Sequence, residues 1–379
     1  MSARRLVIAA AMGIMGFAVS AQAQGQAKVG VALPLTGHSS IAGQEVLRGV
    51  KLAFEDFNAK GGALGGAVAA ITEDDEGSPT KGTVVVRKLI ESDKVCALVA
   101  TYNSDVALAE SKIAREAKIP MSSGGSTSIA VTDANAPGDP WFFRAFPGSD
   151  VQGEQSAVDT VKTLGKKRIA ILHDNSNYGA AVAMQFKKVV AAAGAEILAD
   201  ETYNLGEQDF HPLLQRLKLL KPEAVYIGGI IAEGVLIVRQ AQEIGFQPQF
   251  VGAGSFMTDK FIELTGSASE GFAVSTMFEP DTPNGYGRAF NDRFKKRYGD
   301  NANVFSALGY DSAAVVLEAI KRAGKCDGPA IRDAMKALKG FPLVQGPNGT
   351  TLDYDAKGGS YFKIGMGVIK SGKRQIVPN

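Results

Sequence analysis

The chain has 379 residues, 45% of them hydrophobic, with 41 basic side chains against 39 acidic ones. This length corresponds to about two or three domains, each large enough to bury its own core. The near balance of charge argues against a polyanion partner such as nucleic acid. Only two Cys and three His are present, which argues against a disulfide-built scaffold and against a four-ligand zinc site.

The first 23 residues have the pattern of a secretory signal. Arg4 and Arg5 form a basic start, residues 6–19 are apolar or small, and Ser20-Ala21-Gln22-Ala23 has the small residues of a cleavage site. The apolar run is shorter than the roughly 20 residues that span a bilayer, so we favour a cleaved signal over a retained anchor. Cleavage after Ala23 leaves 41 − 2 = 39 basic residues against 39 acidic ones. We therefore expect an exported, neutral protein.

From Lys28 onward, short apolar strands alternate with amphipathic helices. Residues 28–33 are typical of a buried strand, and a helix from about 44 to 58 places Val46, Val50 and Phe54 on one face. Further strands are predicted near residues 67–72, 95–100, 118–122, 167–173, 195–203, 223–228, 249–253 and 271–276. This alternation predicts an α/β fold with largely parallel sheets covered on both faces. In such sheets, ligands bind beyond the carboxyl ends of the strands.

Two Pro-containing breaks divide the series, at residues 131–140 and 279–283. Three helices are predicted after the second break, at about 284–298, 305–323 and 329–338, and a Gly-rich tail with short strands follows them. This pattern predicts two doubly wound lobes joined by three crossings that act as a hinge. We expect residues 24–144 and 278–355 to form lobe 1, and residues 145–277 and 356–379 to form lobe 2.

Five segments of the chain carry a family resemblance. They are residues 28–37, 57–62, 143–146, 171–179 and 224–229, with sequences such as Lys-Val-Gly-Val-Ala-Leu-Pro-Leu-Thr-Gly and Ala-Val-Tyr-Ile-Gly-Gly. Together they resemble the branched-chain amino-acid (leucine/isoleucine/valine-type) periplasmic substrate-binding proteins of ABC transporters. The resemblance covers essentially the whole chain after the signal.

This resemblance implies a type I periplasmic-binding fold and a periplasmic location. It also implies that a small amino acid or related carboxylate is captured between the lobes and delivered to the transmembrane subunits of an ABC permease. We expect a monomer with no cofactor, no metal and no nucleic-acid partner. The alternative function is a ligand-sensing receptor module that signals to a membrane partner.

In the family, main-chain N–H groups and hydroxyls from two lobe 1 loops hold a ligand carboxylate. Those loops match residues 101–104 and 122–127 here, and the predicted ligand-binding residues are Asn103, Ser104, Gly124, Ser126 and Thr127. The residues themselves agree, because each loop follows a buried strand, Gly124 permits close backbone approach and helix starts offer unpaired N–H groups. Ser104 and Ser126 are also typical helix caps, and a cap can contact a ligand as well.

Lobe 2 is expected to contribute Tyr178, Ile230 and Ser255. The resemblance places Tyr178 at a strand-to-helix turn, where its ring can cover a ligand; a surface or core tyrosine is the alternative. Ile230 and its neighbour Ile231 stand where the family often has aromatic residues, although plain core packing explains one of them equally well. Ser255 and Phe256 are further plausible contacts.

Two positions depart from the leucine-binding relatives. We align Ala42 with a tryptophan that covers the ligand side chain, and Gly254 with a glutamate that pairs with the ligand ammonium. A buried ammonium without a carboxylate partner is costly. Either the ligand lacks an α-amino group, or another acid such as Glu233 or Asp281 reaches it.

Two further expectations concern cysteines and catalysis. Cys96 lies in a predicted strand and Cys326 in a loop, and neither occupies the cystine positions of the relatives, so we expect two separate thiols. The chain has no G-x-S-x-G elbow, H-E-x-x-H motif, Walker loop or G-x-G-x-x-G after a strand. We therefore expect a binding protein and not an enzyme.

Overall fold

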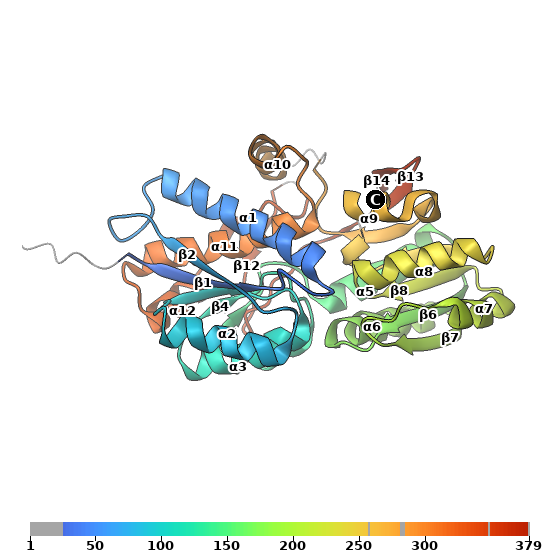
Figure 1. Cartoon of the computed structure of the whole chain (residues 1–379), viewed down its shortest axis with the longest axis horizontal. Coiled ribbons are helices and arrows are strands. Elements are labelled where there is room, and N and C mark those ends of the chain that lie inside the picture. Colours follow the sequence, from blue (N-terminus) through green and yellow to red (C-terminus); the bar gives the residue numbers. More distant parts are fainter. Residues whose placement is uncertain (1–25, 257, 281–284, 348, 378–379) are drawn as a thin grey trace, which may run out of the picture.

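The computed structural model describes residues 26–256, 258–280, 285–347 and 349–377. The predicted signal, residues 1–23, and Asp281 lie outside these ranges. The described chain forms two α/β lobes that lie side by side (Figure 1). Within these ranges, none of the helices has the length and apolar character needed to cross a bilayer.

Lobe 1 is built on a five-stranded parallel sheet in the order β2-β1-β3-β4-β5. Its strands are β1 (Lys28–Leu33), β2 (Ala69–Asp74), β3 (Ala97–Ala100), β4 (Met121–Ser122) and β5 (Phe142–Phe143). The helices between them are α1 (Ser40–Ala59), α2 (Pro79–Glu91), α3 (Ser104–Glu116) and α4 (Ile129–Asp133). Alternate residues of β1 show why both sheet faces are apolar: Val29 and Val31 pack with α1, and Ala32 packs with α2.

Lobe 2 is built on a seven-stranded sheet in the order β14-β13-β10-β9-β8-β6-β7. Its strands are β6 (Arg168–Asp174), β7 (Glu196–Tyr203), β8 (Ala224–Gly228), β9 (Gln249–Gly252), β10 (Ala273–Thr276), β13 (Gly365–Lys370) and β14 (Lys373–Val377). The helices are α5 (Ser149–Val158), α6 (Asn177–Ala192), α7 (His211–Leu220), α8 (Ile231–Glu243) and α9 (Asp259–Thr265), with helical turns η1 (Asp159–Thr163), η2 (Gly254–Phe256) and η3 (Gly266–Ser269). Only β13 and β14 run antiparallel to their neighbours.

Between β10 and β13 the chain returns to lobe 1. This return contains α10 (Gly285–Tyr298), α11 (Val304–Ala323), α12 (Gly328–Lys336), β11 (Lys339–Pro342) and β12 (Thr351–Asp353). Helix α11 packs along α1, and glycines allow the two backbones to approach closely. A Cβ atom built at Gly49 would lie 1.9 Å from the carbonyl oxygen of Ser306, and one built at Gly309 would lie 2.1 Å from that of Val46.

The chain therefore crosses between the lobes three times, after β5, after β10 and before β13. The precise lobe boundaries stay a prediction. Two backbone hydrogen bonds bear on the boundary predicted at residue 355. The N–H of Gly138 donates to the carbonyl oxygen of Ala356, and the N–H of Arg144 donates to the carbonyl oxygen of Gly358. The chain just beyond residue 355 is thus tied to the end of the lobe 1 sheet.

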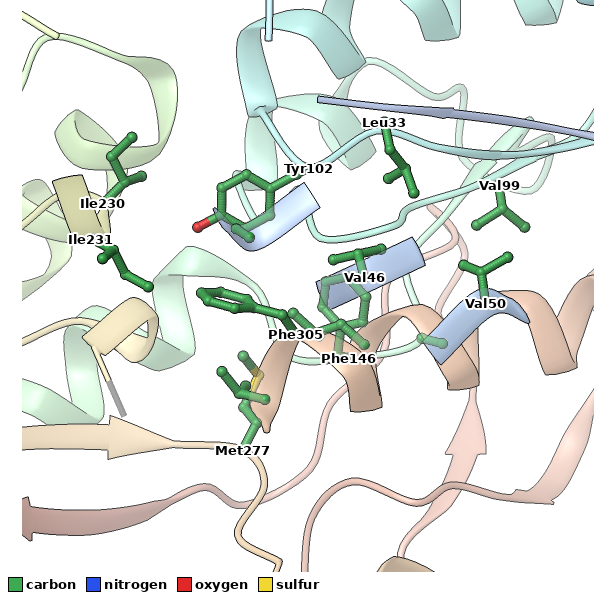
Figure 2. Close-up of a cluster of buried hydrophobic side chains, with 14 of the residues drawn as sticks. Leu33, Val46, Val50, Val99, Tyr102, Phe146, Ile230, Ile231, Met277 and Phe305 are labelled. Carbon is green, nitrogen blue, oxygen red and sulfur yellow. The ribbon is translucent and has the colours of Figure 1, made fainter. Parts of the chain in front are cut away.

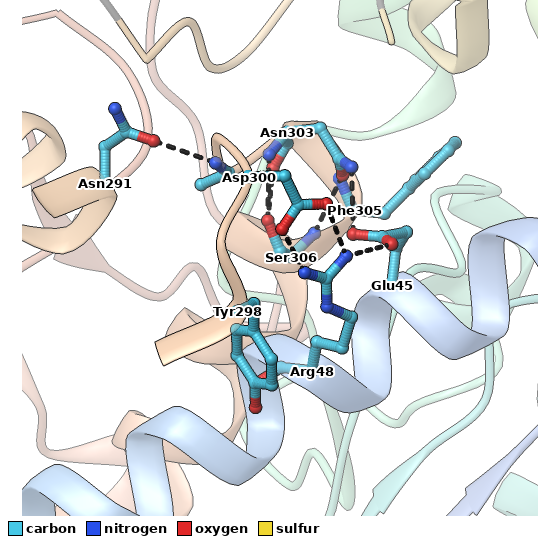
Figure 3. A network of polar contacts seen from close by, with 9 residues as sticks. Glu45, Arg48, Asn291, Tyr298, Asp300, Asn303, Phe305 and Ser306 are labelled. Atoms are coloured by element: carbon cyan, nitrogen blue, oxygen red, sulfur yellow. Dashed lines mark hydrogen bonds and ion pairs between the residues drawn. The ribbon is translucent and has the colours of Figure 1, made fainter. Parts of the chain in front are cut away.

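A polar network fixes the start of α11 against α1 (Figure 3). Asn303 and Ser306 form a reciprocal capping box at the first turn of α11. The Asn303 side chain also donates to Glu45 on α1 (3.0 Å), and Arg48 bridges Glu45 and Asp300. These contacts set the position of Phe305, which follows immediately on α11.

The expectation of two separate thiols is wrong, because Cys96 and Cys326 form a disulfide with a Cα–Cα distance of 5.4 Å. Cys96 precedes β3, and Cys326 lies between α11 and α12. The packing of α11 over the lobe 1 sheet brings these two points together although they are 230 residues apart in sequence. Local sequence patterns carry no information about a contact of this kind.

Candidate functional site

A cavity lies between the lobes and is lined by side chains from both. It encloses about 510 Å³, part of it open to solvent. Six of the eight predicted site residues line it: Asn103, Ser104, Thr127, Tyr178, Ile230 and Ser255. As expected for parallel sheets, most of the lining follows the carboxyl ends of strands.

The lobe 1 side of the cavity is the N-terminus of α3. Asn103 is the N-cap residue, but its side chain does not cap the helix and donates instead to Ser39 Oγ (2.9 Å). The first N–H groups of a helix have no partner within the helix, and they favour an anion. Ser104 and Asp105, the first residues of α3, line the cavity.

The second lobe 1 loop contributes Thr127 and Gly125. The hydroxyl of Thr127 is buried and has no hydrogen-bond partner within the described chain. Gly124 and Ser126 do not line the cavity. A Cβ atom at Gly124 would meet Leu33 in the core at 3.0 Å, and the Ser126 hydroxyl lies 3.1 Å from that of Ser104. Ser126 thus contacts a residue of the cavity wall from behind.

The lobe 2 side is a row of hydroxyl groups. Tyr178 lies 3.3 Å from Ser255 Oγ and 3.2 Å from Gln152 Oε1. From lobe 1, the Tyr102 hydroxyl reaches across to Ser255 Oγ at 3.4 Å. Burial raises the pKa of Tyr102 to about 12 and that of Tyr178 well above its usual range, so both phenols stay neutral.

Apart from Ser176 and Gly254, the remaining lining is apolar and comes from both lobes and from a crossing. It consists of Leu205, Ile230, Met277, Val304, Phe305 and Leu308. Figure 2 shows Ile230 across from Tyr102 and Phe305, with Met277 nearby. Ile231 and Phe256 pack in the hydrophobic core instead, and the ring of Phe256 contacts those of Phe261 and Phe272.

Several residues that line the cavity are not among those predicted from the sequence. Tyr102 lies in the predicted binding loop 101–104, next to the predicted residues Asn103 and Ser104. Gln152 lies in the first turn of α5, just after a crossing, and Phe305 and Leu308 lie on α11. The 3-residue spacing of Phe305 and Leu308 indicates one apolar helix face, but it does not distinguish a cavity wall from the core.

Ala42 and Gly254, the two departures from the leucine-binding pattern, have different positions relative to the cavity. Ala42 is buried and is not part of the cavity lining. Gly254 lines the cavity, and a Cβ atom there would lie 3.0 Å from Gln152 Oε1. Glu233 is buried outside the lining and accepts a hydrogen bond from the main chain of Gly206 (2.8 Å). Among the described residues, no group of His, Cys, Asp and Glu side chains is arranged to hold a metal ion.

Residues 26–364 match the periplasmic binding protein family. The chain belongs to this family. The Leu/Ile/Val-binding protein homolog 2 of Brucella abortus is 30% identical over 331 residues, which are 87% of this chain and 86% of that relative. A leucine-, isoleucine-, valine-, threonine- and alanine-binding protein of Pseudomonas aeruginosa is 29% identical over 351 residues, 92% of this chain and 91% of that relative.

Solved structures of periplasmic binding proteins have the same fold. A leucine-binding protein from Thermotoga maritima superposes with a TM-score of 0.86 at 28% identity, covering 93% of this chain and 98% of that one. A solute-binding protein of an ABC transporter from R. palustris, in complex with benzoate, gives a TM-score of 0.84 at 25% identity over 93% of this chain and 96% of that one. The family and the type I periplasmic-binding fold expected from the sequence are confirmed.

Proposed function

We propose that this chain is an extracytoplasmic solute-binding protein that captures a small carboxylate, an amino acid or a related acid, between its lobes. The observation that carries this proposal is a single cavity whose walls come from both lobes. A ligand that contacts both walls stabilises the closed arrangement by its differential affinity for the two states. Closure then reports that the site is occupied.

The lobe 1 wall suits a carboxylate. The uncapped start of α3 offers main-chain N–H groups, and the unpartnered Thr127 hydroxyl adds a further donor. No Lys or Arg lies among the described residues that line the cavity. Helix N–H groups and hydroxyls therefore supply the anion site, and the apolar side chains around Phe305 cover the body of the ligand.

Export and delivery complete the proposal. The N-terminal signal directs the chain to the periplasm, and the closed form hands its ligand to the transmembrane subunits of an ABC permease. The family membership and the names of the relatives support this role, since those proteins bind leucine, isoleucine, valine or benzoate. The chain acts as a monomer, without a cofactor, and binds without turnover.

A thermal-shift panel tests this function. The panel contains aliphatic and aromatic amino acids, the corresponding deaminated carboxylic acids, and their neutral amides. A ligand at 100 times its Kd stabilises the folded protein by about 2.7 kcal/mol. We expect carboxylates to shift the melting temperature and amides of the same skeleton to have no effect. NMR spectra of the same mixtures should show no consumption of ligand; a product signal would contradict binding without turnover.

A further inference from the structure

The hydroxyl row on the lobe 2 wall has a fixed direction. Gln152 Oε1 can only accept, so the Tyr178 hydroxyl, 3.2 Å away, donates to it. Tyr178 has then used its proton and accepts from Ser255, 3.3 Å away. Ser255 has also used its proton, so Tyr102 is the donor in the 3.4 Å contact with Ser255. All three hydroxyl protons are therefore taken within the row.

One donor remains at the end of this row. Nε2 of Gln152 is buried and has no partner within the described chain, and Gln152 lines the cavity. A buried N–H group without an acceptor is costly, and a ligand oxygen at this point would remove that cost. Gly254 makes room for the amide, since a Cβ atom there would lie 3.0 Å from Gln152 Oε1.

Among the described residues, the lobe 2 side of the cavity lining includes no acidic side chain that could pair with an ammonium group. Asp105 is the one charged side chain among the described residues that line the cavity. Its two carboxylate oxygens already accept from the main chain and the side chain of Asn177. The nearby acids Asp174 and Glu233 are buried outside the lining. An ammonium placed against Gln152 Nε2 would face another donor, and no acidic side chain of the described lobe 2 lining would compensate its desolvation.

From these contacts we infer that Gln152 is a specificity-determining residue, which selects carboxylates bearing a neutral oxygen acceptor, an oxo or hydroxyl group, over α-amino acids. This inference rests on the proposed function and names its ligand class. The carboxylate binds at α3 and Thr127, and the second oxygen accepts from Gln152 Nε2. The apolar body lies among the side chains from lobe 2, the crossing and α11.

Isothermal titration with acids of one skeleton tests the inference. The first series is 4-methylpentanoate, its 2-oxo and 2-hydroxy derivatives, and leucine. The second series is benzoate with its 3- and 4-hydroxy derivatives, which place the oxygen farther from the carboxylate. In at least one series, we expect the oxygen-bearing acid to bind roughly tenfold more tightly than the plain acid. Leucine should be the weakest ligand of the first series.

Variants of Gln152 identify the residue responsible. Gln152→Met keeps the length of the side chain and removes the donor, so the oxygen-bearing and plain acids should bind within about twofold of each other. Gln152→Glu adds a carboxylate and should improve leucine relative to its 2-oxo analogue. Gln155→Met, on the same helix outside the cavity, should leave every ratio unchanged. Thermal unfolding of each variant verifies that it folds.

The outcomes separate this inference from the proposed function. If plain acids bind the wild type as tightly as their oxygen-bearing analogues in both series, carboxylate capture stands and the role of Gln152 is refuted. Tightest binding of leucine refutes it as well. A preference for oxygen that persists in Gln152→Met assigns the selectivity to other groups. If no carboxylate binds, the proposed ligand class fails and this inference fails with it.

Discussion

Asp105 in lobe 1 is hydrogen-bonded to Asn177 in lobe 2, and the contact lies at the rim of the cavity. The Asp105 carboxylate, in the first turn of α3, accepts from both the main-chain N–H (3.2 Å) and the side-chain amide of Asn177, the first residue of α6. Because each residue belongs to a different lobe, the proposed opening of the lobes would break this contact. It stabilises the closed state without depending on the identity of the ligand.

Asn177→Ala removes the side-chain half of this contact. A typical hydrogen bond contributes about 0.5–1.5 kcal/mol, and this one is exposed to solvent, so we expect all ligands to bind about two- to tenfold more weakly, by the same factor. Titration calorimetry measures this factor. Lys188→Ala, an exposed change on the same helix, is the control. A loss of affinity that differs from ligand to ligand would show that Asn177 contacts the ligand itself.

Thr127→Val tests the carboxylate site. The buried Thr127 hydroxyl has no partner within the described chain, so its removal should leave the stability of the unliganded protein unchanged or slightly raised. Affinity for carboxylates should fall by about 1–3 kcal/mol, because the ligand loses a donor. Calorimetric binding together with thermal unfolding checks both parts. Equal loss of stability and affinity would instead assign Thr127 a structural role.

Glu110 makes stability depend on pH. Its carboxylate on α3 is buried against Gly82 of α2, and both oxygens lack a partner within the described residues. Burial, with a smaller contribution from Asp75, raises the pKa of Glu110 well above its ordinary 4.5. The folded state therefore retains a proton that the unfolded chain releases, and the free energy of unfolding falls as pH rises above 4.5.

Glu110→Gln removes this titration. Relative to the wild type, the free energy of unfolding of the variant should rise by about 1.4 kcal/mol per pH unit above 4.5, until the folded carboxyl ionises as well. Urea unfolding of both proteins from pH 4 to pH 8 measures this difference. Glu116→Gln, at the exposed end of α3, serves as the control. A difference that does not vary with pH would disprove the shift.

Replacement of both cysteines tests the disulfide. Cys96→Ala with Cys326→Ala should lower the free energy of unfolding by about 2–5 kcal/mol. Ligand affinity should stay within about twofold, because Cys96 precedes β3 and the cavity lies beyond the opposite end of that strand. Thermal unfolding with and without dithiothreitol supplies the control. The wild type should lose stability on reduction and the double variant should not.

Gly309→Ala tests the close packing of α11 on α1. A Cβ atom at this position would lie 2.1 Å from the carbonyl oxygen of Val46, so the helices must separate. We expect a destabilisation of about 1–3 kcal/mol. Affinity should fall too, because Phe305 and Leu308 on α11 line the cavity. Gly66→Ala, where a Cβ atom meets open space, should leave both quantities unchanged.

The sequence predicted the individual elements well. Predicted strands at 167–173 and 223–228 correspond to β6 and β8, and the predicted helix at 305–323 corresponds to α11. The two strands are short and are centred on continuous apolar runs, α11 is a long helix, and in each of them the local pattern agrees with the burial. The first helix begins four residues earlier than expected, at Ser40, since its initial turn follows a Gly-containing loop without a strong start signal.

The site was only partly predictable, because its walls depend on contacts between distant segments. Asn103 and Thr127 follow strands of one sheet, so their convergence could be expected from the topology. Gln152 and Phe305 reach the cavity only because crossings bring α5 and α11 to its edge. The pairing of Cys96 with Cys326 was missed for the same reason. Periodicity describes which face of an element is buried, but not against which other element.

The threading of the chain also dictates an order of assembly. Residues 149–276 supply the whole parallel part of the lobe 2 sheet in one continuous stretch. Lobe 1 has its five strands by residue 143, yet the α11 layer and Cys326 come only near the end of synthesis. Until then one face of its sheet lacks its partner helix. The first lobe to be synthesised therefore waits for a layer that is made after the parallel strands of lobe 2, and lobe 2 in turn receives β13 and β14 only after that layer.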